Sequence, residues 1–187
     1  MTIPLNQNPE SLFPADILNT IQEDKLWRVA HTKSRREKAL AHYLARAGIG
    51  YYLPMFSRQQ SGDKRVRYSL IPVFNGYLFF QADDFERHKA MRSNHIANII
   101  DVGDEKKLIM ELSQIEKALS GDTKVYPYDF IRQGQWVRVK KGPLKGVEGR
   151  IVRKDRNYRL VLSVESIMQS ICVSIEADQL EPFTNGK

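Results

Sequence analysis

The stretch GQWVRVKKGPLKGVEGRIV, residues 134–152, decides the fold of the C-terminal part of the chain. On both sides of its centre, valines alternate with other residues, which is the period of a strand with one buried face. Gly142 permits a turn with a positive φ angle, while Gly146 and Gly149 let the backbone bend across the sheet. The stretch therefore predicts two short strands joined by a tight turn.

The residues that follow this stretch contain only short strands and turns. Residues 160–164 and 172–175 are rich in β-branched side chains and alternate, and polar turn sequences separate the strands. About fifty residues are too few for two stacked sheets, so we expect a small five-stranded barrel over 133–183. The preceding segment, 121–132, has no periodicity and holds a glycine and a proline, which is typical of a linker.

The first half of the chain alternates strands with helices. Ser34 and Glu37 form a capping box that opens an amphipathic helix, and a glycine closes it. Strands are expected at 26–32, 51–55, 77–80 and 96–102, and helices at 34–48, 84–92 and 107–119. This order predicts a ferredoxin-like βαββαβ domain of the α+β class over residues 26–120. Residues 57–69 are expected to form an exposed loop or hairpin tip, and residues 1–25 an extension that need not belong to the core.

The formal net charge of +7 is concentrated in two blocks. Residues 28–67 hold 10 basic and 2 acidic side chains, and residues 136–159 hold 9 basic and 2 acidic ones. Clustered Lys and Arg are the electrostatic footprint of a nucleic-acid-binding protein. A solvated basic face without a partner explains the same clusters equally well.

Composition excludes several classes of protein. A single cysteine, Cys172, rules out a disulfide framework, and no apolar run reaches the ~18 residues of a membrane span. The first residues lack the basic and apolar regions of a signal peptide, so we expect a cytoplasmic protein without a membrane partner. No nucleophile, P-loop or paired-carboxylate motif is present, and the four histidines are far apart: His31, His42, His88 and His95. We therefore expect no enzymatic activity, no metal and no cofactor.

Two motifs resemble those of a known family. Residues 134–152 resemble a KOW motif, which ribosomal proteins and transcription factors share. Trp27-Arg28-Val29 with Thr32-Lys33, then Tyr52-Leu53-Pro54, then PVFNGYLF at 72–79 resemble, in order and spacing, the N-terminal domain of the NusG family of transcription elongation factors. The resemblance covers about residues 26–183. It implies a NusG N-terminal domain followed by an SH3-like KOW barrel.

The chain departs from the housekeeping members of that family at two places. Asn75 stands where the family usually has proline, and Ile167-Met168-Gln169 stands where housekeeping members have an Ile-Phe-Gly type of sequence. Together with the N-terminal extension and the basic segment 58–67, these departures resemble the specialised, operon-specific paralogues of the RfaH type.

The resemblance implies a transcription elongation or antitermination factor that suppresses pausing or termination. Its first domain is expected to bind the clamp helices of RNA polymerase through an apolar depression at His31, Phe74, Tyr77 and Phe79. By alternation, Tyr77 and Phe79 share one face of their strand. Without the resemblance, an aromatic residue in a strand, such as Phe79, is more often part of the core.

The basic residues near the first helix suit contacts with phosphates, and the resemblance implies non-template DNA or nascent RNA as the ligand. They are Lys33, Arg35, Arg36, Lys38, Arg65 and Arg67. The basic side chains of the barrel, between residues 140 and 156, are explained equally well by RNA contacts or by solubility. An alternative function is that of a KOW-type RNA-binding module, ribosomal or hairpin-binding, that does not act on polymerase. We expect a monomer.

The barrel is expected to bind a second partner. Ile167 and Met168 look like exposed apolar loop residues, and the family suggests a ribosomal protein or the termination factor Rho as their partner. RfaH-like relatives can hold this domain as a helical hairpin against the polymerase site. Residues 155–181 contain neither glycine nor proline, but their β-branched alternation favours strands. We predict that the barrel is the resting state, with both loop residues exposed and the polymerase-binding face open.

Overall fold

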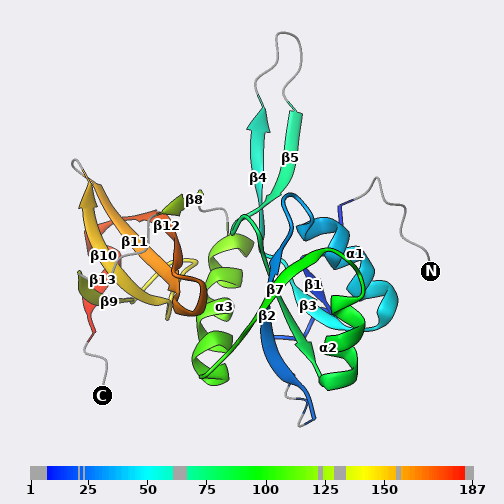
Figure 1. The fold of residues 1–187 in the computed structure, drawn as a ribbon. Helices are drawn as coiled ribbons and strands as arrows, with labels where there is room; N and C mark the ends of the chain where they lie inside the picture. Colours follow the sequence, from blue (N-terminus) through cyan, green and yellow to red (C-terminus); the bar gives the residue numbers. More distant parts are fainter. Residues whose placement is uncertain are drawn as a thin grey trace. The chain divides into compact units, whose positions relative to one another are not determined.

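The chain forms two compact units, residues 1–105 and residues 106–187, each described here by itself. A computed structural model describes residues 8–20, 22, 24–60, 67–121, 124–128, 134–154 and 157–183. Figure 1 shows the course of the chain through these segments.

A five-stranded antiparallel sheet is the centre of the N-terminal unit. Its strand order is β1-β3-β6-β2-β7 (Figure 1), with the bounds Leu12–Phe13, Gly50–Tyr52, Tyr77–Ala82, Leu26–Thr32 and Ile96–Asp101. In the βαββαβ order, β2, β3, β6 and β7 are the first, second, third and fourth strands. Their order in the sheet, β3-β6-β2-β7, is that of a ferredoxin-like sheet, to which β1 is added at one edge. The predicted fold class is confirmed.

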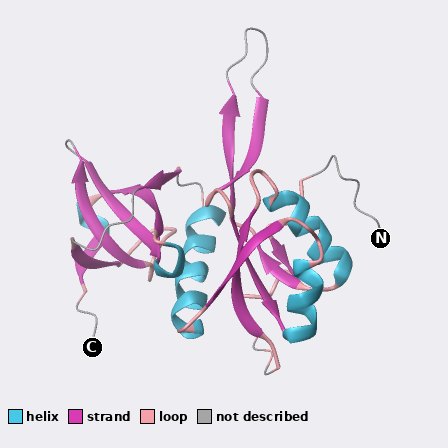
Figure 2. Ribbon diagram, in the orientation of Figure 1, coloured by secondary structure: helices cyan, strands magenta, loops and turns pink. Residues whose placement is uncertain are grey.

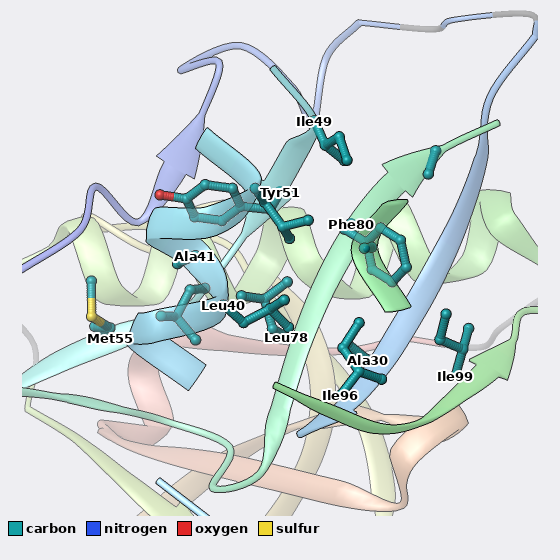
Figure 3. Close-up of a cluster of buried hydrophobic side chains, with 14 residues drawn as sticks. Ala30, Leu40, Ala41, Ile49, Tyr51, Met55, Leu78, Phe80, Ile96 and Ile99 are labelled. Carbon is teal, nitrogen blue, oxygen red and sulfur yellow. The ribbon is translucent and has the colours of Figure 1, made fainter. Parts of the chain in front are cut away.

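Two helices cover one face of this sheet. α1 (Glu37–Ala47) and α2 (Asp84–Met91) follow β2 and β6 in the chain, and α1 ends at Gly48 in the left-handed conformation, φ 72°. Their apolar side chains join a buried cluster with alternate residues of the strands, among them Leu40, Leu78 and Phe80 (Figure 3). Each fully buried side chain of this kind contributes about 1.5–3 kcal/mol relative to an exposed position. This cluster is the main core of the unit.

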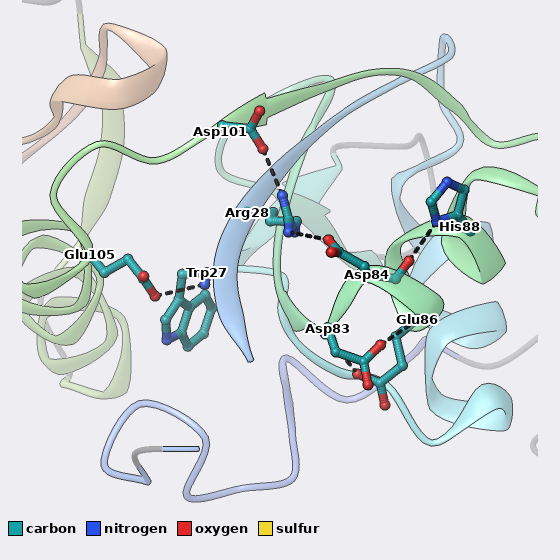
Figure 4. Close-up of polar contacts among 8 residues, drawn as sticks. All are labelled: Trp27, Arg28, Asp83, Asp84, Glu86, His88, Asp101 and Glu105. Carbon is teal, nitrogen blue, oxygen red and sulfur yellow. Dashed lines mark hydrogen bonds and ion pairs between the residues drawn. The ribbon is translucent and has the colours of Figure 1, made fainter. Parts of the chain in front are cut away.

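The start of α1 differs from the sequence prediction. A capping box was expected between Ser34 and Glu37, but the N-cap residue is Arg36, and no side chain caps the helix. The left-handed conformation of Arg35, φ 57°, forms a turn ahead of the helix and removes Ser34 from the capping position. A capping box exists instead at α2, where Asp83 accepts a hydrogen bond from the Glu86 N–H (Figure 4).

Part of the N-terminal extension, within residues 8–20, belongs to the core, although from the sequence we expected only that the extension 1–25 need not belong to it. β1 pairs with β3, and Phe13 stacks on Tyr51 with ring centroids 6.0 Å apart. Ile17 is 1% exposed and lies over Gly50, where a Cβ atom would come within 2.6 Å of its Cδ1. Burial raises the pKa of Tyr51, and its hydroxyl donates to the Glu10 carbonyl at 3.0 Å. A two-residue strand is too short to show an alternating pattern, so no local pattern in the sequence indicates β1.

A second, two-stranded sheet projects from the N-terminal unit as a hairpin (Figure 2). It consists of β4 (Met55–Gln60) and β5 (Arg67–Pro72), which pair in antiparallel register from Met55 with Pro72 to Gln60 with Arg67. This agrees with the hairpin expected at 57–69. The expected tip around Gly62 and Asp63 lies outside the described residues.

The C-terminal unit contains a six-stranded antiparallel sheet. Its order is β13-β9-β10-β11-β12-β8, with the bounds Leu180–Pro182, Gln135–Val139, Glu148–Lys154, Asn157–Val164, Gln169–Ile175 and Val125–Tyr128. Five of these strands belong to the predicted barrel, and the sixth, β8, lies in the segment 121–132 that we expected to be a linker. Pro127 obscured this strand in the sequence, but an edge strand tolerates proline because one of its sides needs no ladder hydrogen bonds. Residues 157–164 and 169–175 are strands, not a helical hairpin.

The helix α3 (Glu105–Ser120) is hydrogen-bonded to the C-terminal sheet. The Gln114 side-chain oxygen accepts from the Glu148 N–H, and the Glu111 carboxylate accepts from the Glu165 N–H. Lys107 also forms an ion pair with Glu165. The division into compact units therefore places residues 106–120 with this sheet. The boundary after residue 120 that we drew from the sequence stays a prediction.

Candidate partner-binding and nucleic-acid-binding surfaces

The sheet face that α1 and α2 leave uncovered carries a row of aromatic side chains. Cross-strand pairing places Tyr52 and Val29 on either side of Phe79, and His31 beside Tyr77. Phe79 is 0% exposed and meets Phe74, which is 1% exposed, edge to face at 6.2 Å. These buried rings form the floor of this part of the sheet.

An accessible aromatic pair lies at the end of that row. His31 and Tyr77 stack with ring centroids 5.1 Å apart and an interplanar angle of 27°. His31 is exposed, and Tyr77 is half-buried. A stacked pair on two paired strands presents a flat apolar surface with polar edges, which suits contact with another protein.

A tight turn positions this pair. The Tyr77 N–H donates to the Phe74 carbonyl at 3.2 Å, and Gly76 has φ 84°, which is the requirement of the third position of a type II turn. Asn75, at the second position, is exposed. Proline is common at that second position, so asparagine in its place is compatible with the same turn.

Glu37 anchors the same turn and was missed as a site residue. Its side chain is 7% exposed, and its Oε1 accepts a hydrogen bond from the Gly76 N–H at 2.6 Å. On the other side of the turn, the Gly76 carbonyl accepts from the Thr32 N–H at 2.8 Å. Sequence reasoning assigned Glu37 to a capping box because a contact with a residue 39 positions away leaves no local pattern.

The four residues expected to bind polymerase therefore divide into two kinds. His31 and Tyr77 are accessible, whereas Phe74 and Phe79 are buried, so the face is not open at those two positions. Alternation correctly placed Tyr77 and Phe79 on one face of β6. Alternation does not predict how much of that face is buried. Because Phe74 and Phe79 are buried, we infer that they support His31 and Tyr77 rather than contact a partner.

Basic side chains gather in the turn between β2 and α1. Lys33, Arg35 and Arg36 are exposed, and the Lys33 N–H donates to the His95 carbonyl at 2.8 Å. The Lys33 ammonium also binds the side-chain oxygen of Asn94. Burial lowers the pKa of His95, and the nearby charges of Arg36, Lys33 and Arg46 lower it further. The turn before α1 and the turn before β7 thus form one electropositive surface, which we call the basic surface.

Lys38, also expected to contact nucleic acid, is held by hydrogen bonds within the N-terminal unit. Its ammonium donates to the Leu70 carbonyl at 2.6 Å and to the Asn8 side chain at 2.7 Å, so it ties the base of the hairpin to α1 and to the N-terminal segment. Burial lowers its pKa, and Glu37 opposes that shift. Of the two expected hairpin residues, Arg65 lies outside the described residues, and Arg67 is placed by its backbone in β5.

The opposite end of β2 is not part of the basic surface. Arg28 is 8% exposed, and its guanidinium contacts Asp101 at 2.7 Å and Asp84 at 3.2 Å (Figure 4). Next to it, the Trp27 N–H donates to the Glu105 carboxylate at 2.8 Å. Because two carboxylates neutralise Arg28, this residue of the basic block 28–67 adds no free charge.

In the C-terminal unit, the expected loop residues differ in exposure. Ile167 ends a 3-10 turn and is 7% exposed, whereas Met168 follows it in the left-handed conformation, φ 50°, and is 53% exposed. We expected both to be exposed, so the expectation is wrong for Ile167. Because the chain reverses at Met168, the Ile167 side chain is buried while the Met168 side chain is exposed to solvent.

Three glycines of the stretch 134–152 are required by the backbone around them: Gly142, Gly146 and Gly149. Gly142 and Gly146 have φ values of 86° and 87°, in the region that side chains rarely adopt. Gly149 has no such angle, but a Cβ atom there would lie 2.6 Å from the Val161 carbonyl oxygen. Glycine is required at Gly142 and Gly146 for the positive φ angle, and at Gly149 because no Cβ atom fits there.

Comparison with known proteins identifies the family. A family model described as "Transcription termination factor nusG" matches residues 25–119. The chain belongs to the NusG family. NusG-family proteins are transcription factors rather than enzymes, and this places the chain among transcription elongation factors in the broad sense. No curated protein matches the chain.

One solved structure similar to the chain is the crystal structure of an MjSpt4:Spt5 complex in conformation B. The sequence identity is 15%, the alignment covers 87% of this chain and 99% of that one, and the TM-score is 0.26. A likeness at this level carries no argument about partners.

The described residues lack two further features, a membrane-spanning helix and a metal-binding cluster. None of the described helices is both long and apolar enough to cross a membrane. Among the same residues, no group of three or more His, Cys, Asp or Glu side chains is arranged to hold a metal ion.

Proposed function

We propose that this protein is a transcription elongation and antitermination factor that docks on the clamp helices of RNA polymerase and suppresses pausing or termination. The observation that carries the proposal is the stacked pair of His31 and Tyr77, held at the surface of the domain that matches the NusG family. The C-terminal unit would recruit a second partner, such as a ribosomal protein or Rho. As a monomer in the cytoplasm, the factor would act by binding alone.

The backbone that carries His31 and Tyr77 supports a role for this pair in docking. The pair stands on two paired strands, and the turn behind it is fixed by three hydrogen bonds, so little side-chain entropy is lost on binding. Suppression of pausing then requires only that the factor binds the closed clamp more tightly than the open one.

We expect Tyr77→Ala to weaken polymerase binding by about 2 kcal/mol, roughly 30-fold, as for a central aromatic anchor. The measurement is the affinity of the full chain for core polymerase at high salt, where apolar docking persists and phosphate contacts fade. Phe85→Ala is the matched control, because Phe85 is 78% exposed and belongs to α2, which covers the opposite face of the sheet from Tyr77. Equal binding by a folded Tyr77→Ala variant would contradict clamp docking and favour the RNA-binding alternative.

The basic surface would contact nucleic acid beside the polymerase. Lys33, Arg35 and Arg36 are exposed, and burial, together with the charges of Arg36 and Lys33, lowers the pKa of the neighbouring His95. Guanidinium and ammonium groups placed in this way bind phosphates without reading sequence. Non-template DNA or nascent RNA would then add affinity that the apolar docking surface does not supply.

We expect the double variant Arg35→Gln, Arg36→Gln to reduce binding of nucleic acid and to lower the salt dependence of that binding by about 1–2 in log–log slope. Polymerase docking at high salt stays within a factor of about two, because these residues lie outside the stacked pair. The matched control is Lys106→Gln, Lys124→Gln, which removes two exposed charges elsewhere. An unchanged salt slope would mean that the basic surface is only solvated charge.

A further inference from the structure

Glu37 makes a buried contact with a distant part of the chain. It is the first residue of α1, and its Oε1 accepts a hydrogen bond from the Gly76 N–H at 2.6 Å. The positive end of the helix dipole favours a carboxylate in the first turn, which offsets part of the cost of its burial. The contact therefore connects the start of α1 to the turn that carries Tyr77.

Gly76 lies against both residues of the stacked pair. A Cβ atom at Gly76 would lie 3.6 Å from Cδ2 and 3.7 Å from Nε2 of the His31 ring, so this ring covers one side of the glycine. Gly76 is also bonded directly to Tyr77, and its carbonyl accepts from the N–H of Thr32, the residue after His31. A displacement of the Gly76 peptide therefore changes the position of the two rings relative to each other.

Gly76 needs hydrogen bonds to hold one conformation. Its φ is 84°, and glycine exchanges between positive and negative φ at little steric cost. The bond at its carbonyl comes from β2, and the bond at its N–H comes from Glu37 in α1. When the Glu37 oxygen is removed, we expect the turn to sample other conformations, in which His31 and Tyr77 no longer stack.

We propose that Glu37 is a positioning residue for polymerase docking, which fixes the Gly76 peptide and thereby holds His31 and Tyr77 in their stacked arrangement. Glu37 is buried and acts through the pair rather than by contact with the partner. Rings that are ordered by folding lose less entropy when a partner binds. This inference rests on the proposed docking and adds the residue that orders the docking surface beforehand.

The test measures the affinity of the full chain for core RNA polymerase at high salt, with the folded state of each variant checked by denaturant unfolding. Glu37→Asp keeps the charge but shortens the side chain by one methylene, so the carboxylate no longer reaches the Gly76 N–H. We expect the affinity to fall about fivefold, which is the size of effect that one hydrogen bond produces. Glu37→Met, which fills the same space without an acceptor, should show the same loss.

Two control variants separate positioning from general stability. Glu37→Gln keeps the length of the side chain and an oxygen acceptor, so it should retain the affinity within about twofold. Glu86→Asp shortens a carboxylate in the first turn of the other helix, α2, where it accepts from the Asp83 N–H and pairs with Lys25. This variant should lose stability but not polymerase affinity.

A double variant supplies a readout that a merely structural role does not change. In the Tyr77→Ala background, Glu37→Asp should change the affinity less than about twofold, because the residue acts only through the pair. A fivefold loss that persists in this background overturns the proposal, as does an equal loss for Glu86→Asp. If Glu37→Asp and Glu37→Met both fail to fold, the contact is structural and the positioning role is overturned.

The same measurements distinguish failure of this inference from failure of the proposed function. If Tyr77→Ala binds polymerase weakly and the folded Glu37→Asp variant binds as tightly as the unaltered chain, docking stands and the positioning role falls. If Tyr77→Ala itself binds as tightly as the unaltered chain, the docking proposal fails, and this inference fails with it.

Discussion

Phe79→Ala should lower the free energy of unfolding of the N-terminal unit by about 3–5 kcal/mol, and any loss of polymerase binding should follow from that instability. Phe79 is 0% exposed, pairs with Val29 and Tyr52 on the neighbouring strands and meets Phe74 edge to face. Truncation removes a full aromatic ring from the centre of the sheet and leaves a cavity that the paired backbone cannot close. A loss of this size is a large part of the stability of a small domain.

Denaturant unfolding measures this effect, with Phe85→Ala as the control for removal of an exposed phenylalanine. The control variant should unfold within about 0.5 kcal/mol of the unaltered chain. A Phe79→Ala variant of full stability that nevertheless fails to bind polymerase would contradict the structure, because it would make Phe79 a contact residue. The informative variant for docking is therefore Tyr77→Ala, whose side chain reaches the surface.

The contrast between Tyr77 and Phe79 illustrates what periodicity can predict. Alternation places both side chains on one face of β6, and this holds in the structure. Burial of that face depends on elements far away in the chain, which leave no local pattern at residues 77–79. The same limit explains Ile167, whose exposure was predicted from its position in a loop.

Glu37 and Lys38 show the same limit for polar residues. Spacing from Ser34 predicted a capping role for Glu37, and clustering with other bases predicted a nucleic-acid contact for Lys38. Their observed partners are Gly76 and Leu70, more than thirty positions away. Glycines at turns were easier to interpret, because a positive φ angle is a local requirement that few residues meet.

Gly149→Ala should destabilise the C-terminal unit by about 3 kcal/mol and leave the N-terminal unit folded. An added Cβ atom would lie 2.6 Å from the Val161 carbonyl oxygen and 3.0 Å from side-chain atoms of Leu160 and Leu162. The two side chains can rotate away, but the carbonyl belongs to a strand held between β10 and β12. Relief of the clash therefore requires the pairing of β10 with β11 to loosen.

Gly103→Ala is the matched control for this substitution, since nothing lies within 4 Å of a Cβ atom at Gly103. Limited proteolysis or amide exchange, read separately over residues 8–105 and 134–183, measures where the chain loosens. Gly149→Ala should raise exchange in the second segment only, while the Tyr77-dependent affinity for polymerase is retained. If the two units unfold together in this variant, the N-terminal docking surface depends on the C-terminal sheet, and recruitment and docking cannot be separate activities of separate units.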